Sequence, residues 1–345
     1  MATPRAVVIG YGFAGRCFHS YLISITPALA LHGVASRSAA TRERIVAERR
    51  CRAYESFEEV LADPDVDLVV LATPNSTHAD LAVRALKAGK HVVTDKVMCL
   101  TLKDCDRMIA AATASGRMLN VFQNRRWDGD FLTLKKAMAE GLLGDVRWLE
   151  MAWQGFGAWG GWRGQAAMGG GKLYDLGAHL LDQMTLLFPE PIETVYCRMH
   201  HDLPETDVES QAMVVVGFQG GRTAVCDVSS LAAISKPRIY ACGTGGTFIK
   251  YGLDPQEAAM IAGDIDSARE DERNSARIHN GRTEMAFPTV AGRWRCYYEN
   301  IADVLARGAE TAVKLPEVRR AIAVIDAAFR SAKTGRTVRA AIPSA

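Results

Sequence analysis

The stretch Arg5-Ala6-Val7-Val8-Ile9-Gly10-Tyr11-Gly12-Phe13-Ala14-Gly15 lies close to the start of the sequence. Residues 5–9 are rich in β-branched side chains and are followed by glycine, which predicts a short buried strand. The next six residues match G-x-G-x-x-G. Gly10 allows a tight turn, Gly12 lets the backbone approach a pyrophosphate, and Gly15 lets a helix pack close to the strand. That helix is expected over 13–24, with the N–H groups of Phe13 and Ala14 at its positive end, where phosphates bind. The stretch predicts a dinucleotide-binding turn; the alternative is a glycine turn with a structural role only.

Strands and helices alternate after this turn. Strands are expected over 29–35, 67–72, 91–94 and 117–122, and helices over 39–49, 57–62, 77–88 and 102–114. Such alternation is typical of a doubly wound parallel sheet. Ligands of these sheets lie beyond the carboxyl ends of the strands. The residues at those ends are therefore expected to line one crevice: Gly10, Ser36, Thr73 and Lys96.

The end of the second strand indicates which dinucleotide is bound. An acidic residue commonly stands there to hold the ribose 2′-hydroxyl of NAD, but this chain has Ser36-Arg37, with Arg42 and Arg44 nearby. A hydroxyl and a guanidinium suit a 2′-phosphate, because arginine binds phosphate through charge-assisted and often bidentate hydrogen bonds. We therefore expect NADP(H) to be favoured over NAD(H). The alternative is that Arg37 stacks on the adenine, which is compatible with either cofactor.

The pattern changes after Gln123. A helix over 130–140 is followed by strands over 146–153, 194–199, 211–218, 222–229, 237–242 and 246–250, with glycine turns at 220–221 and 243–246. Strand following strand predicts an open, mostly antiparallel sheet with helices on one face. Residues 254–280 are charged and are expected to form an irregular excursion, and helices over 293–307 and 316–333 end the chain. The expected domains are 1–123 and 124–345.

One stretch of the second half, residues 169–182, combines a glycine run with ionisable side chains. At about 100° per residue, Asp175, His179 and Asp182 fall on one stripe of a helix, and leucines fall on the opposite face. The apolar face can pack into a core while the stripe faces a cleft. A carboxylate at i and an imidazole at i+4 are neighbours, so Asp175 could orient His179 as a proton acceptor. The alternative is an amphipathic helix with a hydrated face.

The segment 153–163 carries aromatic residues among glycines: Trp153, Phe156, Trp159 and Trp162, followed by Arg163. Aromatic rings suit the C–H-rich faces of a pyranose or cyclitol, and arginine suits hydroxyl or acid groups. The segment therefore predicts a substrate wall, and a subunit contact made by exposed aromatic residues is the alternative. Asn124 and Arg125, at the start of the second domain, are expected to reach the same cleft.

The composition limits the remaining possibilities. With 345 residues, 48% of them hydrophobic, and a net charge of +2, the chain is long enough for two cores and signals no polyanionic partner. We find no dense basic run for nucleic acid and no apolar run long enough for a membrane span. The eight cysteines are scattered without a CxxC, which indicates free thiols in a reducing cytoplasm. No metal site is indicated.

Four motifs, taken in order, resemble those of the Gfo/Idh/MocA family of sugar and polyol oxidoreductases. They are Gly10-x-Gly12-x-x-Gly15, Thr73-Pro74-Asn75-x-x-His78, Asp95-Lys96, and Gly170-Gly171-x-Leu173-x-Asp175-x-Gly177-x-His179-x-x-Asp182. The runs Asn124-Arg125-Arg126-Trp127 and Tyr174–Gln183 resemble the NADP-linked scyllo-inositol dehydrogenase-like branch. The resemblance implies an N-terminal Rossmann domain and a C-terminal domain built on an open antiparallel sheet. It also implies that Thr73, Pro74, Asn75, His78, Asp95 and Lys96 join the glycine turn, Ser36 and Arg37 in binding the cofactor.

The resemblance further implies that Lys96 contacts the substrate hydroxyl and the nicotinamide, and that Asp175 and His179 are paired acid/base residues. Oxidation of a carbinol removes a proton from oxygen while hydride leaves carbon for nicotinamide C4. A base at the oxygen and a nearby cation lower that barrier. We therefore expect His179 to be the base, Asp175 to orient it, and Lys96 to be the cation, with Lys96 and His179 converging on one carbinol.

This chain departs from the family at one position, since the usual motif is Glu-Lys-Pro and the chain has Asp95-Lys96-Val97. A cis bond before a residue other than proline costs about 2.5–4 kcal/mol, so a trans bond is expected between Lys96 and Val97.

The expected activity is hydride transfer between a nicotinamide and a hydroxyl or keto carbon of a sugar, sugar derivative or cyclitol. Alternatives are an aldose or glycoside dehydrogenase, a reductase of a keto sugar such as anhydrofructose, and a non-catalytic dinucleotide- or sugar-binding regulator. A homodimer or homotetramer is expected from the exposed face of the C-terminal sheet.

Overall fold

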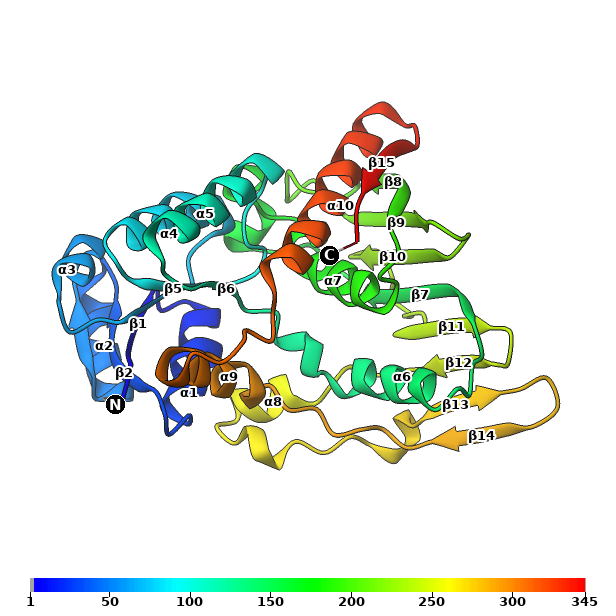
Figure 1. Ribbon diagram of the computed structural model, residues 1–345, viewed down its shortest axis with the longest axis horizontal. Helices are drawn as coiled ribbons and strands as arrows, with labels where there is room; N and C mark the ends of the chain where they lie inside the picture. Colours follow the sequence, from blue (N-terminus) through cyan, green and yellow to red (C-terminus); the bar gives the residue numbers. More distant parts are fainter. Residues whose placement is uncertain (1–2, 345) are drawn as a thin grey trace. The chain divides into compact units, whose positions relative to one another are not determined.

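The computed structural model describes residues 3–344 and divides the chain into two compact units (Figure 1). The first unit is Met1–Gln123 together with Trp294–Val318, and the second is Asn124–Arg293 together with Arg319–Ala345. The chain first passes from one unit to the other after Gln123. The return of Trp294–Val318 to the first unit was not expected.

Six parallel strands form the sheet of the first unit. They are β1 (Arg5–Ile9), β2 (Ala30–Ala35), β3 (Arg52–Tyr54), β4 (Leu68–Leu71), β5 (His91–Thr94) and β6 (Leu119–Val121). Their order, β3-β2-β1-β4-β5-β6, reverses between β1 and β4, which is the doubly wound Rossmann arrangement. The expected fold is therefore confirmed for this unit. Only β3 was missed, because Arg52-Ala53-Tyr54 contains no run of β-branched residues.

Helices flank this sheet on both sides. They are α1 (Ser20–Ser24), preceded by a π-helical turn at Ala14–His19, then α2 (Ala39–Arg49), α3 (Phe57–Ala62), α4 (His78–Lys87), α5 (Leu102–Ser115) and α9 (Arg295–Arg307). Ser38, Ser56 and Thr101 cap α2, α3 and α5 by accepting a backbone N–H from the first turn. In Figure 1, α4 lies beside α5 on one side of the sheet and α1 beside α9 on the other.

Aromatic packing explains why α9 and its flanks belong to the first unit. Trp294 is fully buried with its ring centroid 5.9 Å from that of Phe18, and Tyr297 lies 4.9 Å from Phe122. The Tyr297 hydroxyl also donates to Oδ1 of Asn120 at 2.8 Å. These partners are far away in the sequence, so no local pattern predicts the contact.

Nine strands form the sheet of the second unit. They are β7 (Val146–Gln154), β8 (Ile192–His200), β9 (Gln211–Phe218), β10 (Thr223–Ser229), β11 (Ile239–Gly243), β12 (Thr247–Lys250), β13 (Ala276–His279), β14 (Glu284–Phe287) and β15 (Val338–Ile342). The order is β14-β13-β12-β11-β7-β10-β9-β8-β15. Every neighbouring pair is antiparallel except β7 with β10, which confirms the expected mostly antiparallel sheet.

The helices of this unit are α6 (Gly129–Ala139), α7 (Ala178–Leu187), α8 (Gln256–Ile261) and most of α10 (Leu315–Thr334). Figure 1 shows α6, α7 and α10 on one face of the sheet. The interpretation of 254–280 as an irregular excursion was wrong in part. The segment contains α8 and ends in β13, because Ala276 and Ile278 alternate inward and are buried while β13 pairs with β12. None of the helices in the described chain has the length and apolar character that a bilayer span requires.

Candidate active site

The glycine turn after β1 has the form that a pyrophosphate site needs. Gly10 has a φ of +98°, and a Cβ there would lie 2.6 Å from the carbonyl oxygen of Ala72 at the end of β4. A Cβ on Gly15 would collide with the carbonyl oxygen of Gly10, so the helix packs on the turn only because both residues are glycine. At Gly12, by contrast, a Cβ would meet no atom within 4 Å, which leaves open space beside the backbone. This turn fits a bound dinucleotide, with Phe13 and Ala14 starting the helix.

The loop after β2 presents one arginine to solvent. Arg42 donates from Nη1 to the carbonyl oxygens of Ser36 and Arg37, at 3.0 Å each, and so braces the loop. Arg44 is bound to Glu48 at 2.8 Å. The exposed Arg37 side chain makes no hydrogen bond to any part of residues 3–344. Of the three arginines in this region, Arg37 is thus the one whose guanidinium is available to a 2′-phosphate.

The loops after β4 and β5 are tied together by a buried histidine. His78 is fully buried, with Nδ1 2.9 Å from the carbonyl oxygen of Val97 and Nε2 3.0 Å from that of Thr73. Burial lowers the pKa of this imidazole. His78 therefore fixes the loops that carry Thr73, Pro74 and Lys96, and its side chain is not open to a ligand. Asn75, the other motif residue here, is also buried.

The peptide bond between Lys96 and Val97 is cis, so the expectation of a trans bond was wrong. That expectation considered only the local preference of the bond. Tertiary contacts hold the segment instead, since Val97 is 1% exposed and its carbonyl oxygen is bound by His78. Lys96 itself is half-buried at the carboxyl end of β5.

A second histidine, which the sequence reasoning missed, lies next to Asp95. His19 is fully buried, with Nδ1 2.7 Å from the Tyr298 hydroxyl and Nε2 3.7 Å from Oδ2 of Asp95. Oδ1 of Asp95 accepts the backbone N–H of Lys96 at 2.8 Å. Burial alone would raise the pKa of Asp95, but the neighbouring His19, Lys96 and His78 lower it to about 2. Asp95 is thus a fixed negative charge beside Lys96.

In the second unit, the glycine-rich stretch forms a π-helical turn, Leu173–Gly177, that leads into α7. Asp175 lies in this turn, and its Oδ2 accepts from Nε of Arg163 at 3.1 Å. The structure therefore brings together two of the predicted site residues, one from the helix and one from the aromatic segment.

Asp182 does not share the environment of Asp175, so the expected ionisable stripe facing a cleft was wrong in part. Asp182 is 1% exposed and accepts hydrogen bonds from Nε and Nη2 of Arg126, at 2.7 Å each. The π-helical turn changes the angle per residue, so the wheel of a regular helix does not apply across 173–177. Asp182 belongs to the core, where its charge is paired.

His179, in the first turn of α7, is 3% exposed and packs against Trp153 of β7. The two ring centroids lie 6.1 Å apart with 29° between the planes. Arg125 and Arg238 also contact Trp153, with their guanidinium carbons 4.3 and 4.7 Å from the ring centroid. Trp153 therefore sets the position of the His179 ring.

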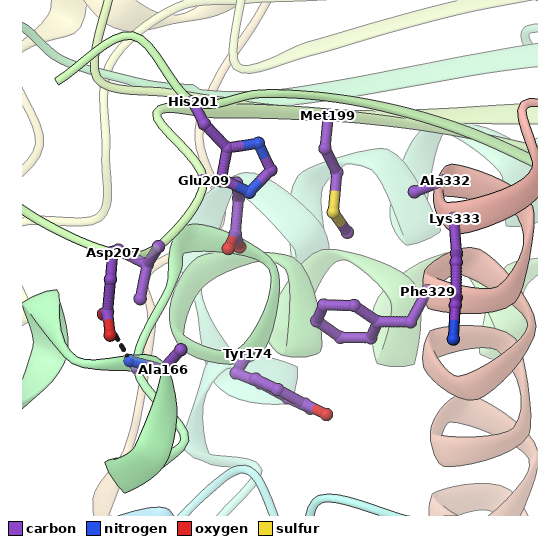
Figure 2. Close-up of a pocket in the computed structure, with 11 residues that line it drawn as sticks. Ala166, Tyr174, Met199, His201, Asp207, Glu209, Phe329, Ala332 and Lys333 are labelled. Carbon is purple, nitrogen blue, oxygen red and sulfur yellow. Dashed lines mark hydrogen bonds between the residues drawn. The ribbon is translucent and has the colours of Figure 1, made fainter. Parts of the chain in front are cut away.

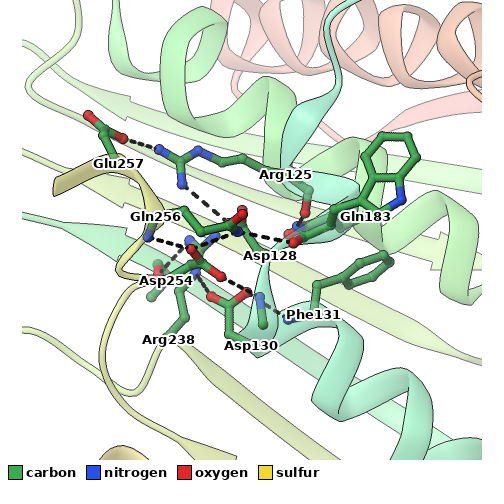
Figure 3. Close-up of polar contacts among 12 residues, drawn as sticks. Arg125, Asp128, Asp130, Phe131, Gln183, Arg238, Asp254, Gln256 and Glu257 are labelled. Carbon is green, nitrogen blue, oxygen red and sulfur yellow. Dashed lines mark hydrogen bonds and ion pairs between the residues drawn. The ribbon is translucent and has the colours of Figure 1, made fainter. Parts of the chain in front are cut away.

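Arg125 and Asn124 are both buried. Figure 3 shows the Arg125 guanidinium between Asp128, at 3.2 Å, and Glu257. Burial raises the pKa of Asp128, against the attraction of Arg125. Asp128 and Glu257 pair the charge of Arg125. The Arg125 guanidinium also packs on Trp153, the ring that contacts His179.

The aromatic segment divides into exposed and packed parts. Phe156 is 78% exposed, whereas Trp159 and Trp162 are half-buried beside cations. The Lys172 ammonium lies 3.3 Å from the ring centroid of Trp159, and the Arg163 guanidinium carbon lies 4.8 Å from that of Trp162.

A cavity of about 490 Å³ lies next to the π-helical turn Leu173–Gly177. Figure 2 shows it between Tyr174, the segment with His201 and Glu209, and the α10 residues Phe329 and Lys333. Oε1 of Glu209 accepts the backbone N–H of Leu173 at 2.7 Å, which fixes the start of the turn. Within residues 3–344, no group of three or more His, Cys, Asp or Glu side chains is arranged to hold a metal ion.

Comparison with known proteins agrees with this geometry. Residues 4–123 match the family described as "Oxidoreductase family, NAD-binding Rossmann fold", and residues 131–249 match the GFO/IDH/MocA C-terminal domain. The chain belongs to the Gfo/Idh/MocA family. Among its relatives, the uncharacterized oxidoreductase YdgJ of Escherichia coli K12 is 35% identical over 97% of this chain and 98% of that protein. The scyllo-inositol 2-dehydrogenase (NADP(+)) IolW of Bacillus subtilis 168 is 30% identical, covering 97% and 96%.

A solved structure extends the likeness to three dimensions. The crystal structure of an NAD-binding protein from Listeria innocua superposes with a TM-score of 0.86 at 33% identity, covering 98% of this chain and 97% of that one. This Gfo/Idh/MocA chain is accordingly an NAD(P)-binding oxidoreductase with a Rossmann domain, and the open turn at Gly12 fits the pyrophosphate of such a cofactor.

Proposed function

We propose that this oxidoreductase transfers hydride between NADP(H) and a hydroxyl or keto carbon of a sugar, sugar derivative or cyclitol. The observation that carries the proposal is the pair of ionisable residues at the start of α7. Asp175 is held by Arg163, and His179 is held against Trp153, so both side chains have fixed positions. A protein that only bound the cofactor would need no such acid/base pair.

In the proposed reaction, His179 accepts the proton of the carbinol oxygen, and in the reductive direction it returns that proton. Asp175 orients the imidazole and stabilises its charged form. The Lys96 ammonium stabilises the developing alkoxide. Bound NADP⁺ supplies the hydride acceptor at its nicotinamide ring. Asp95 keeps a negative charge beside Lys96.

The preference for NADP(H) rests on Ser36 and Arg37. Names of relatives do not decide it, because the Bacillus subtilis relative is named as NADP-linked and the Listeria innocua protein as NAD-binding. Arg37 is the exposed arginine of this loop, and a 2′-phosphate would give its guanidinium a charged acceptor. Gly10, Gly12, Phe13, Ala14 and Gly15 are proposed to hold the pyrophosphate, with Thr73, Pro74 and Asn75 along the crevice.

The substrate wall is proposed to consist of Trp153, Trp159, Trp162 and Arg163. Asn124 and Arg125, which are buried, support it indirectly. We further propose a homodimer or homotetramer in the cytoplasm, with residues 1–123 binding the dinucleotide and 124–345 supplying the substrate and subunit contacts.

The proposal is tested by mixing the protein with NADP⁺ and a panel of cyclitols and sugars while following the absorbance of reduced nicotinamide. NADPH with keto sugars tests the opposite direction, which also covers a reductase of anhydrofructose-like substrates. Turnover with at least one member supports the proposal. Tight cofactor binding without turnover in either direction would instead identify a dinucleotide-binding regulator.

A further inference from the structure

The turn that carries Asp175 is covered by the segment Trp159–Gln165, and glycines make this possible. The N–H of Gly170 donates to the carbonyl oxygen of Gln165 and that of Gly171 to Arg163, at 3.0 Å each. A Cβ on Gly170 would collide with the Arg163 carbonyl oxygen. Gly171, with a φ of +109°, adopts a backbone conformation that other residues rarely reach. The backbone hydrogen bonds therefore hold the segment Trp159–Gln165 against the turn that carries Asp175.

Lys172 is the unusual member of this cluster. The residue is 5% exposed, and its ammonium lies over the ring of Trp159. It makes no hydrogen bond or close ion pair to any residue among 3–344. Burial lowers the pKa of Lys172 to about 8, although Asp175 and Glu209 attract its charge. Burying a cation without an acceptor is costly, and ionisable groups with shifted pKa values cluster at functional sites.

Arg163 brings a second cation to Asp175, one of the two carboxylates that attract Lys172. Its Nε binds Asp175, but its two Nη groups make no hydrogen bond to the described part of the chain, and the side chain is 31% exposed.

The two carboxylates nearby already accept hydrogen bonds from other groups. Asp175 is already bound to Arg163, and one oxygen of Glu209 accepts the N–H of Leu173. Burial raises the pKa of Glu209, and the N–H of Leu173 and the charge of Lys172 oppose that rise. Two cations with unused donors therefore stand next to the proposed acid/base pair.

We propose that the substrate of this enzyme carries an acidic group, and that Lys172 and Arg163 bind that group. The inference rests on the proposed function, because it assigns the substrate class of the same site. An anionic oxygen would supply the acceptor that the Lys172 ammonium lacks and would pair with the outer edge of the Arg163 guanidinium. The group is a carboxylate or a phosphate on a sugar or polyol, and a neutral hydroxyl would satisfy only the hydrogen bond.

The competing explanation is that Lys172 only holds Trp159 against the turn. A purely structural role predicts that loss of Lys172 weakens acidic and neutral ligands by the same factor. A role in binding the acid predicts that only the acidic ligand is weakened, and that Lys172→Arg restores part of the loss.

Calorimetric titration of the NADP⁺-saturated protein separates these explanations. D-glucuronate and D-glucose differ only at C6, and D-glucose 6-phosphate distinguishes phosphate from carboxylate. Wild-type protein is expected to bind an acidic member at least about tenfold more tightly than glucose. Lys172→Met should remove that preference, while Lys136→Met, which removes an exposed lysine paired with Glu140, should keep it.

The outcomes for this inference and for the proposed function are distinct. Equal affinity for acidic and neutral sugars, or an unchanged acid preference in Lys172→Met, overturns the acidic-group inference even if neutral polyols are oxidised. Lys172-dependent binding of acids without any turnover in the panel keeps the anion site and rejects the proposed reaction. No binding of any acidic sugar to the wild-type protein also overturns the inference.

Discussion

Arg126 and Asp182 form a bidentate ion pair, in which Nε of the arginine lies 2.7 Å from Oδ2 and Nη2 lies 2.7 Å from Oδ1. Both side chains are nearly inaccessible to solvent, at 7% and 2% exposure. The pair shows that two aspartates seven residues apart on one helical stretch have different tasks. Asp182 holds the core of the second unit together, and Asp175 is left to the proposed chemistry.

Replacing Asp182 by Asn should therefore destabilise the protein without any direct effect on the reaction. The substitution leaves the buried Arg126 charge uncompensated, which typically costs about 3–5 kcal/mol. Urea unfolding measures this loss. Glu140→Gln, which breaks an exposed pair with Lys136, is the control and should cost less than about 1 kcal/mol. Equal losses for the two variants would show that the buried pair is not critical.

Arg163→Met is expected to lower turnover far more than stability. The pair with Asp175 is partly exposed, so its loss should cost less than about 1 kcal/mol of unfolding free energy. Asp175 would lose a donor that fixes it, and kcat/KM should fall at least about tenfold, a loss of roughly 1.4 kcal/mol in the barrier. Arg147→Met, at an exposed arginine of β7, is the matched control. Unchanged kcat/KM in Arg163→Met would remove Arg163 from the site.

Arg37→Asp should shift the cofactor preference from NADP towards NAD. The new carboxylate would repel a 2′-phosphate and could accept from the 2′-hydroxyl of NAD. We expect the ratio of the two dissociation constants to change by at least about tenfold, which corresponds to roughly 1.4 kcal/mol. Arg84→Asp, which removes an exposed arginine of α4 that pairs with Glu58, should leave the ratio unchanged. No shift in Arg37→Asp would place the selectivity elsewhere.

Lys172→Met should stabilise the protein at neutral pH. The pKa of Lys172 is about 8 in the folded chain, below its value in the unfolded chain, so the unfolded state binds more protons between these values. The burial of the charge costs about 3 kcal/mol below pH 8, and this cost is relieved as pH rises towards about 10.5. Loss of the contact with Trp159 offsets about 1–2 kcal/mol of the gain. The groups that face the ammonium are Asp175, Glu209 and Trp159.

Urea unfolding of both proteins at several pH values checks this prediction. The variant should be more stable by about 1–2 kcal/mol near pH 7, and the difference should vanish or reverse near pH 10.5. A variant that is less stable at neutral pH would contradict the assignment of Lys172 as a costly buried cation.

The sequence predicts much of this architecture because its strongest signals are local. The alternation of strands and helices gives the Rossmann sheet, and the glycines at 10, 12 and 15 give the cofactor turn. The strands β3, β13, β14 and β15 were not expected, because none of them contains a run of β-branched residues. The return of Trp294–Val318 to the first unit depends on contacts with Phe18 and Asn120, which no local pattern contains.

The site residues show the same limit. Asp175 and His179 are recognisable from their spacing. Asp182 is buried instead because it pairs with Arg126, which lies 56 residues away in the sequence. The contact of His19 with Asp95 and the position of Lys172 over Trp159 likewise arise only on folding. A lone histidine in an apolar helix and a lysine after a glycine run give no signal of their own.

The central claim is that His179 moves the proton of a carbinol during hydride transfer to NADP⁺. The most direct measurement is the initial rate of NADP⁺ reduction by the wild-type protein and by His179→Ala, with the dissociation constant for NADP⁺ measured on both. The account predicts that the variant loses at least about 100-fold in kcat, as expected for a general base, while its affinity for NADP⁺ stays the same. Turnover by His179→Ala at the wild-type rate would contradict it.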